Sequence, residues 1–315
     1  MNSKKIKLGV IGVGYLGKHH VKHLSQFECV DLVGIYDINK NLMNEVANQY
    51  KVPTSPSIDE LYQKADAISI VTPTKQHYEI AIKALEHNCH IFIEKPISDS
   101  IKSAERILKK KLETNKVVHV GHIERFNPAF KSFMKQNRKP LFLECHRLTK
   151  INNRSMDISV VEDLMIHDID LVLQMVDSPI KKIIADGINV ISDNVDLANV
   201  KLIFRDGTVA NLTASRISNK DMRKIRVFEN QKYSSIDLFN KDVIEYSASK
   251  NEQNKLIFQN KNLSVDNYDA LAKELAHFCD CIMRNDINTT NINNSIEALQ
   301  ISQQINQIIQ DKAIK

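Results

Sequence analysis

Residues 9–20 of the chain, GVIGVGYLGKHH, decide its fold. Gly12, Gly14 and Gly17 make a G-x-G-x-x-G pattern that follows an apolar stretch and opens an amphipathic one. In such a turn the first glycine permits a tight bend, the second lets the backbone approach a pyrophosphate, and the third lets the helix pack on the strand. The free N–H groups and the helix dipole then face the anion. The pattern predicts a phosphate-binding turn between a strand and a helix; a glycine-rich turn without a ligand is the alternative.

A carboxylate stands at the end of the second predicted strand. Asp37 follows the apolar stretch 30–36 and lies twenty residues after Gly17. At this position a carboxylate accepts hydrogen bonds from the adenosine ribose and repels the 2′-phosphate of NADP. No arginine follows Asp37 directly, although Lys40 is close. The spacing favours NAD over NADP, and a surface aspartate without a ligand is the alternative.

Short apolar stretches alternate with amphipathic ones along the first 120 residues. Strands are predicted at 6–11, 30–36, 67–71, 90–93 and 117–120, and helices at 16–27, 41–50, 78–87 and 101–114. Strands that are apolar throughout and alternate with helices indicate a parallel sheet covered on both faces. We therefore expect an α/β protein whose residues 1–122 form a doubly wound Rossmann domain.

The second half of the chain has a different pattern. Longer strands are predicted at 140–148, 180–190, 197–204, 209–214, 225–229 and 235–239, and helices at 161–175, 269–283 and 295–309. Asp206-Gly207 separates two of these strands, which indicates a hairpin. We expect residues 123–315 to form an α+β domain with a large, mainly antiparallel open sheet. The terminal helices are free to pack back on the first domain.

The composition excludes several classes of protein. The 315 residues carry a net charge of +5, but 43 basic and 38 acidic residues are mixed throughout, so no nucleic-acid partner is expected. None of the five cysteines forms a C-x-x-C pair, which predicts free thiols in a reducing compartment and no metal site. No apolar stretch reaches about 18 residues, and the N-terminal residues do not read as a signal peptide. We expect a cytoplasmic protein without a membrane segment.

Further motifs accompany the glycine turn. Residues 71–74 read V-T-P-T with a histidine at 77, residues 94–96 read E-K-P after a buried strand, and residues 163–168 read D-L-M-I-H-D. With these motifs the chain resembles the glucose-fructose oxidoreductase / inositol dehydrogenase / MocA (Gfo/Idh/MocA) family. The resemblance is most specific over residues 9–168 and implies an NAD-dependent dehydrogenase that acts on a CH–OH group.

The turn pattern and the resemblance together predict the cofactor site. Glu94 is implied in contacting the nicotinamide ribose, and a cis bond between Lys95 and Pro96 would aim the lysine. The residues expected to contact NAD are Gly12, Gly14, Tyr15, Leu16, Gly17, Asp37, Thr72, Pro73, His77, Glu94 and Lys95.

Alcohol oxidation needs a hydride acceptor and a group that takes the hydroxyl proton. Asp163 and His167 are four residues apart, so they share one helix face. An imidazole, with an ordinary pKa of about 6.5, is suited to accept that proton. Lys95 is suited to polarise the same oxygen. By resemblance Lys95 and His167 are the catalytic pair and Asp163 assists. Taken singly, His167 is better explained as a structural histidine, and Lys95 as an exposed loop lysine.

The substrate side has its own signals. Residues 121–128 (GHIERFNP), residues 160–170 and Ser215-Arg216 resemble the nucleotide-sugar branch of the family, above all UDP-N-acetylglucosamine 3-dehydrogenases. Guanidinium groups match phosphate oxygens, although ordinary ion pairs explain arginines as well. Asn127 either binds a sugar hydroxyl or caps the helix that Pro128 begins. The expected substrate contacts are Lys95, Arg125, Asn127, Arg147, Arg154, Asp163, His167 and Arg216.

The resemblance implies hydride transfer from C3 of the sugar to NAD. The 3-keto nucleotide sugar would feed an aminotransferase that leads to 3-amino sugars for a cell-surface glycan or lipid A. An inositol or free-sugar dehydrogenase of the family is a second hypothesis, and it needs no diphosphate site. A non-catalytic NAD-binding regulator is a third hypothesis, and it predicts loss of the lysine or the histidine. A structural protein leaves the glycine turn and Asp37 unexplained.

The predicted open sheet also bears on assembly. No helix is predicted between about residues 204 and 269 to cover that sheet. A partner subunit would bury the uncovered face. We therefore expect a homodimer or a homotetramer through the second domain.

Overall fold

The structure is a computed structural model that describes residues 5–151, 156–288 and 292–313. The chain forms two compact units, Met1–Ile123 with Asp269–Ile296, and Glu124–Tyr268 with Glu297–Lys315. Residues 269–283 thus belong to the first unit, an arrangement that the predicted division at residue 122 leaves open. Within the described residues, none of the helices combines the length and the apolar character needed to cross a membrane.

The described part of the first unit contains a parallel sheet of strand order β2-β1-β3-β4-β5. Every residue of β3 and of β5 is buried, as expected for strands covered on both faces. The predicted doubly wound sheet is therefore confirmed. The strands are β1 (Ile6–Ile11), β2 (Val30–Tyr36), β3 (Ala67–Ile70), β4 (His90–Glu94) and β5 (Val118–Gly121). The helices are α1 (Gly17–Leu24), α2 (Lys40–Tyr50), α3 (Ile58–Lys64), α4 (Thr74–Glu86), α5 (Ile101–Thr114) and α8 (Ala270–Met283).

One core of the first unit lies between the sheet and helices α1, α2 and α8. Val21, Met43 and Phe278 come from these three helices and join the same buried cluster as Val10 and Phe92 of the sheet. α8 thus supplies part of the core of a sheet that precedes it by about 150 residues of chain. The first unit needs both stretches of sequence to bury its apolar side chains.

Two helices of the first unit differ from the prediction. α3 was not predicted, because its seven residues are too few for a helical periodicity to stand out. Its start has a clear cap, since the Ser57 hydroxyl oxygen accepts a hydrogen bond from the Glu60 N–H at 3.1 Å. α4 begins at Thr74, four residues before the predicted start at 78.

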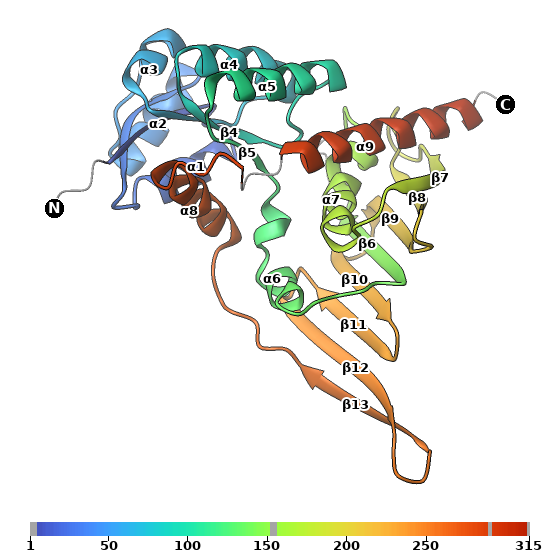
Figure 1. Ribbon diagram of the computed structural model, residues 1–315. Helices are drawn as coiled ribbons and strands as arrows, with labels where there is room; N and C mark the ends of the chain where they lie inside the picture. The colour runs from blue at the N-terminus through green and yellow to red at the C-terminus, as the bar shows by residue number, and fades with distance from the viewer. Residues whose placement is uncertain (1–4, 152–155, 289–291, 314–315) are drawn as a thin grey trace. The chain divides into compact units, whose positions relative to one another are not determined.

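The described part of the second unit contains a larger sheet, of strand order β13-β12-β11-β10-β6-β9-β8-β7 (Figure 1). Only β6 and β9 pair in parallel among these neighbours, so the sheet is mainly antiparallel as predicted. The strands are β6 (Phe142–Lys150), β7 (Ile180–Ile188), β8 (Leu197–Phe204), β9 (Val209–Ser218), β10 (Met222–Glu229), β11 (Lys232–Asp237), β12 (Asp242–Lys250) and β13 (Leu256–Asn262). The helical segments are a 3-10 helix (Ile123–Phe126), α6 (Pro128–Met134), a π-helical turn (Val161–Met165), α7 (Ile166–Met175) and the part of α9 (Ile292–Ala313) from Glu297 onward.

The two faces of this sheet differ in chemistry. The buried core joins residues of the sheet such as Val200 and Leu212 to residues of α6, α7 and α9. On the other face, aromatic rings follow one another across four neighbouring strands, and consecutive ring centroids lie 5.9, 5.0 and 5.4 Å apart. The rings are those of Phe142, Phe228, Tyr233 and Tyr246, which are paired in register.

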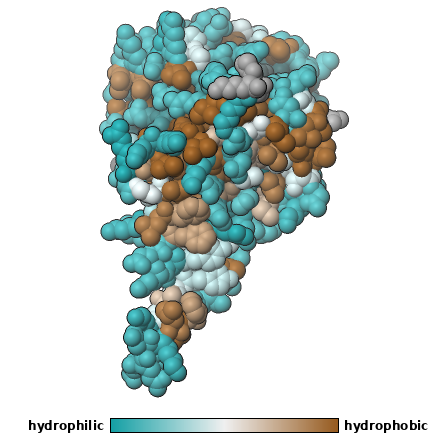
Figure 2. Space-filling model, turned by 90° about the vertical axis from the view of Figure 1, so that its right-hand side faces the viewer, coloured by the Kyte–Doolittle hydropathy of each residue, from teal (hydrophilic) through white to brown (hydrophobic). Residues whose placement is uncertain are grey.

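The hairpin between β12 and β13 was not predicted. Every residue of β13 is exposed, including Leu256, Ile257 and Phe258. In Figure 2, apolar patches lie among polar side chains at the lower end of the molecule, where Figure 1 places this hairpin. A strand without a buried face has no alternation of apolar and polar residues to reveal it. By contrast, the hairpin predicted at Asp206-Gly207 is confirmed, because it joins the antiparallel strands β8 and β9.

Candidate active site

The glycine turn follows β1 and opens α1. Gly12 has φ +88°, and a Cβ atom there would lie 2.6 Å from the carbonyl oxygen of Val71. A Cβ atom on Gly17 would lie 2.0 Å from the carbonyl oxygen of Gly12, whereas a Cβ atom on Gly14 would meet nothing within 4 Å. The fold therefore requires Gly12 and Gly17. Gly14 instead leaves open space beside the turn, which fits the close approach of a pyrophosphate.

Asp37 ties the glycine turn to the end of β2. Its Oδ2 accepts a hydrogen bond from the Val13 N–H at 2.8 Å, and its Oδ1 accepts one from the Asn39 N–H at 2.9 Å. Each oxygen keeps a further lone pair for a ribose hydroxyl. Lys40, the nearby cation, lies over the Tyr36 ring, 4.5 Å from its centroid. This donor and acceptor set fits the ribose of NAD.

His77 contacts the backbone of the V-T-P-T loop at residues 71–74. The imidazole is buried, and its Nδ1 and Nε2 lie 2.9 Å from the Pro96 carbonyl oxygen and 2.8 Å from the Thr72 carbonyl oxygen. Burial lowers the pKa of His77, although the two carbonyl groups act in the opposite direction. The hydroxyl oxygen of Thr72 is buried and has no hydrogen-bond partner among the described residues. His77 thus joins the loop at residues 71–74 to Pro96 of the E-K-P motif. Pro73 is exposed and caps α4.

The E-K-P motif ends β4. The Lys95–Pro96 bond is cis, and the Lys95 side chain is half-buried. The Glu94 carboxylate lies beside a group that sequence reasoning missed, the imidazole of His20, with 3.1 Å between Oε1 and Nε2. His20 is on α1, only three residues after Gly17, and its Nδ1 lies 2.9 Å from the hydroxyl oxygen of Ser69 on β3. The remaining turn residues differ in exposure: Tyr15 is 69% exposed, and Leu16 is the half-buried N-cap of α1.

The second unit places Asp163 and His167 on consecutive helical segments. Asp163 lies in the π-helical turn, where its N–H donates to the Ser159 carbonyl oxygen at 3.0 Å, and His167 lies in the first turn of α7. Both side chains are half-buried. π-helical turns inside helices occur frequently at functional sites. The sequence predicted one continuous helix here and gave no signal of the turn.

The arginines proposed for a substrate make ion pairs inside the second unit. Arg125 donates to Asp170 through Nε at 2.8 Å and Nη2 at 2.5 Å. Buried Arg147 donates to Asp168 at 2.8–3.1 Å and to Glu124 at 2.9 Å. Burial disfavours the charge on Arg147, but the two carboxylates outweigh that effect and raise the pKa of the guanidinium. The geometry favours the ion-pair alternative for Arg147.

The remaining candidates are placed as follows. Arg216 is buried, and its Nη2 donates to the Ile158 carbonyl oxygen at 2.6 Å. Asn127 caps α6, because its Oδ1 accepts from the Ala129 N–H at 3.0 Å, and its Nδ2 also has partners inside the unit. The helix-capping alternative for Asn127 is therefore the one that the structure supports. Arg154 lies outside the described residues.

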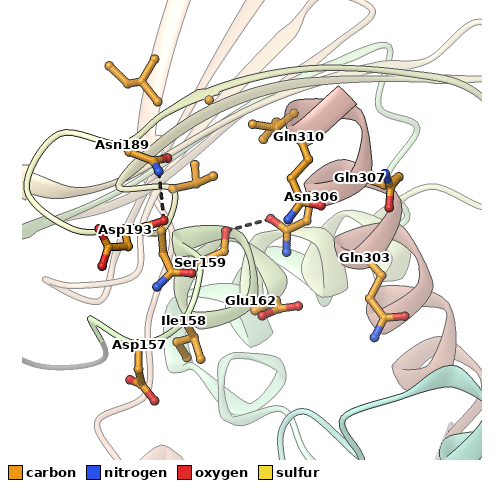
Figure 3. Close-up of a pocket in the computed structure, with 15 residues that line it drawn as sticks. Asp157, Ile158, Ser159, Glu162, Asn189, Asp193, Gln303, Asn306, Gln307 and Gln310 are labelled. Atoms are coloured by element: carbon orange, nitrogen blue, oxygen red, sulfur yellow. Dashed lines mark hydrogen bonds between the residues drawn. The ribbon is translucent and has the colours of Figure 1, made fainter. Parts of the chain in front are cut away.

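A cavity of about 680 Å³ opens in the second unit beside the π-helical turn (Figure 3). Its wall comes from Ser159 and Glu162, from the loop between β7 and β8, and from α9. Figure 3 shows the Ser159 hydroxyl donating to Asn306 Oδ1 at 2.8 Å and the Asn189 amide donating to the Asp193 carbonyl oxygen at 3.0 Å. Carboxamides dominate the polar part of the wall, and its described lining includes no lysine, arginine or histidine. Such a wall suits a ligand with neutral hydroxyl or amide groups better than one with phosphates.

Comparisons with known proteins agree with these features. Residues 6–122 match the family model described as "Oxidoreductase family, NAD-binding Rossmann fold", and residues 121–231 match the "GFO/IDH/MocA C-terminal domain". The chain is 34% identical over 280 residues to the UDP-N-acetylglucosamine 3-dehydrogenase of Acidithiobacillus ferrooxidans, covering 88% of each chain. It is 24% identical over 232 residues to the myo-inositol 2-dehydrogenase of Thermotoga maritima, covering 67% of this chain and 69% of the relative.

Solved structures give the same result. A structure of the Acidithiobacillus ferrooxidans UDP-N-acetylglucosamine 3-dehydrogenase has a TM-score of 0.90 and 31% identity, covering 98% of each chain. The myo-inositol 2-dehydrogenase from Lactobacillus plantarum has a TM-score of 0.82 at 19% identity, which shows a shared fold. The predicted fold, the enzyme class and NAD as cofactor are thereby confirmed. The chain belongs to the Gfo/Idh/MocA family of NAD-binding oxidoreductases.

Proposed function

We propose that the chain oxidises the C3 hydroxyl of UDP-N-acetylglucosamine with NAD and forms the 3-keto nucleotide sugar. The observation that carries the proposal is the similarity to the Acidithiobacillus ferrooxidans enzyme, at 34% identity over 88% of each chain. That similarity extends in three dimensions to 98% of this chain, so it includes the sheet of the second unit. The Thermotoga maritima inositol dehydrogenase covers 67% of the chain at 24% identity, which supports the free-polyol alternative less well.

The chemistry is divided among three side chains. Bound NAD supplies the acceptor for the hydride that leaves the carbinol carbon. His167 takes the hydroxyl proton, and the Lys95 ammonium donates to the same oxygen as its negative charge grows. Asp163 orients the lysine or the sugar. The half-buried state of all three side chains supports these roles, because a group that meets a substrate needs an exposed part.

The substrate has a charged part and neutral parts, which call for different surroundings. Among the three described candidate arginines, Arg125 has the most exposed side chain, at 16% against 3% for Arg147 and 6% for Arg216. We assign the diphosphate to Arg125, with Arg154 as the second candidate. The carboxamide-lined cavity of Figure 3 is assigned to a neutral part of the nucleotide sugar, because its described lining includes no lysine, arginine or histidine.

The reaction is tested by following the formation of NADH through its absorbance. The panel is UDP-N-acetylglucosamine, UDP-glucose, free N-acetylglucosamine and myo-inositol, each with NAD and with NADP. A ketone trap belongs in the assay, because the equilibrium disfavours the ketone. Turnover with myo-inositol and with none of the UDP-sugars would overturn the substrate assignment. Lys95→Met and His167→Ala should each abolish turnover while NADH binding persists; retained turnover in either variant contradicts the catalytic roles.

Two further parts of the proposal concern the protein in the cell. The enzyme is cytoplasmic, where its product meets an aminotransferase that makes a 3-amino sugar. It assembles as a homodimer or homotetramer through the face of the larger sheet that carries the aromatic rings. A monomeric mass by light scattering at micromolar concentration contradicts the assembly.

A further inference from the structure

The carboxylate of Glu94 lies between two groups that restrict its position. His20 Nε2 is 3.1 Å from Glu94 Oε1. On the other side, a Cβ atom added to Gly121 would lie 2.9 Å from the same oxygen and 3.0 Å from the carboxyl carbon. The glycine at 121 thus leaves just enough room for the carboxylate. The Glu94 side chain is 12% exposed, so part of the group faces outward from the end of β4.

The protonation pattern of His20 follows from its two neighbours. A carboxylate only accepts hydrogen bonds, so Nε2 of His20 must carry the proton that faces Glu94. In a neutral imidazole Nδ1 is then an acceptor, and the Ser69 hydroxyl, 2.9 Å away, donates to it. His20 and Ser69 are both 0% exposed, so water does not compete for these bonds. One tautomer and one orientation of the His20 ring therefore satisfy the hydrogen bonds to both Glu94 and Ser69.

Aromatic packing holds the same ring in place. The Phe92 ring contacts the His20 ring edge to face, with centroids 5.2 Å apart. On its other side Phe92 stacks on His119 at 5.0 Å, and His119 lies 3.1 Å from Glu274 of α8. His20 is therefore fixed by packing as well as by hydrogen bonds, and the support extends to α8.

We propose that His20 is a positioning residue for the cofactor: locked by Ser69, it holds one oxygen of Glu94 so that the other faces a ribose hydroxyl of NAD. The inference rests on the proposed role of Glu94 at the cofactor and deepens it. Among the described residues Oε2 of Glu94 has no hydrogen-bond partner, so it is the oxygen left for the ligand. His20 transfers no proton and touches no substrate.

A double-mutant cycle on the full-length chain tests the proposal, with NADH affinity from fluorescence titration as the readout. His20→Leu should weaken NADH binding by about tenfold to a hundredfold, the range for losing a hydrogen bond to a charged group. In the Glu94→Ala background, His20→Leu should weaken NADH binding less than about twofold, because the carboxylate that His20 positions is absent. If His20→Leu weakens NADH binding equally in the wild-type and Glu94→Ala backgrounds, the proposal is overturned. It is also overturned if Glu94→Ala binds NADH as tightly as the wild type.

Three more variants separate positioning from stability. His20→Gln keeps a donor for Glu94 and should restore affinity to within about threefold of the wild type. Ser69→Ala removes the lock on the tautomer and should weaken NADH binding in the same direction. His119→Leu removes a ring from the other side of Phe92 without touching Glu94, so it should lower the urea midpoint but leave NADH affinity unchanged. If His20→Leu fails to fold, Ser69→Ala and His20→Gln decide the question.

The outcome is independent of the sugar. A wild-type chain that binds NADH but does not oxidise UDP-N-acetylglucosamine refutes the proposed substrate and leaves the cycle informative. If His119→Leu weakens NADH binding as much as His20→Leu does, the effect belongs to packing and the proposal fails.

Discussion

Arg147 of β6 and Asp168 of α7 are joined by three hydrogen bonds of 2.8–3.1 Å in the interior of the second unit. A fourth bond, at 2.9 Å, connects the same guanidinium to Glu124. The last aspartate of the D-x-x-x-H-D motif therefore holds the strand against the helix that carries His167. This ion pair fixes α7 against β6, and it leaves the Arg147 side chain only 3% exposed.

Arg147→Met should destabilise the chain by about 3–5 kcal/mol, because it leaves the carboxylates of Asp168 and Glu124 buried without their partner. Urea unfolding measures the loss. Arg223→Met is the matched control, since Arg223 is 45% exposed and lies 3.6 Å from Glu124; its loss should stay below about 1 kcal/mol. A folded Arg147→Met variant with wild-type stability and a raised KM for the nucleotide sugar would instead favour phosphate binding by Arg147.

The glycines of the turn should separate into two classes. Gly12→Ala adds a Cβ atom against the Val71 carbonyl at a positive φ, so it should lower the urea midpoint of the whole chain. Gly14→Ala meets no atom within 4 Å, so the chain should keep its stability and lose about tenfold or more in NADH affinity. Fluorescence titration and urea unfolding of both variants check this. Equal NADH affinity in Gly14→Ala and wild type would contradict the assigned pyrophosphate position.

The cofactor preference should depend on Asp37. Asp37→Ser removes the charge that repels a 2′-phosphate and one acceptor for the ribose, so NADH affinity should fall about tenfold and the preference over NADPH should shrink. Titration of both cofactors gives the ratio. Asp31→Ser, at an exposed position of β2, the strand that Asp37 follows, is the control and should leave the ratio unchanged. An unaltered ratio in Asp37→Ser would argue against a ribose contact.

Acid should weaken the second unit through Asp196. Burial raises the pKa of this group, but hydrogen bonds from the Ile191 and Val190 N–H groups outweigh it and hold the pKa at about 2, below the ordinary 3.8. Because the folded pKa is the lower one, the stabilisation is complete above pH 4 and disappears as the pH falls toward 2. Asp196→Asn should remove this part of the acid dependence of unfolding, whereas Asp193→Asn, at an exposed position of the same loop, should keep it. A wild-type slope in Asp196→Asn contradicts the assignment.

The first unit was predictable because its signals are local. Each buried strand is a short apolar stretch of sequence. The turn that begins at Gly12 requires glycine for steric reasons, so the glycine pattern marks the turn in the sequence. The elements that were not predicted were missed for physical reasons too. In the first unit, α3 is too short for its helical period to be seen. In the second unit, β13 has no buried face, so Leu256 and Phe258 form no pattern with their neighbours.

The candidate site was predictable only as a set of motifs. Nothing local connects His20 with Glu94, 74 residues later, or Arg147 with Asp168, because a histidine or an arginine finds its partner through the fold. The sequence showed four arginines beside a suspected anion and left ion pairs as the alternative. In the structure Arg147 makes such ion pairs, and its acid partners lie on other elements of the same unit.

The place of α8 in the first unit has a consequence for synthesis. A ribosome that has released residues 1–123 has made every strand of the parallel sheet, yet Leu271, Leu275 and Phe278 of its core are still untranslated. The apolar surface that α8 covers in the folded first unit therefore stays exposed while the ribosome synthesises the residues of the larger, mainly antiparallel sheet. A protein truncated at residue 123 should therefore aggregate, and a chain in which a short linker joins residue 123 to residue 269 should stay in solution.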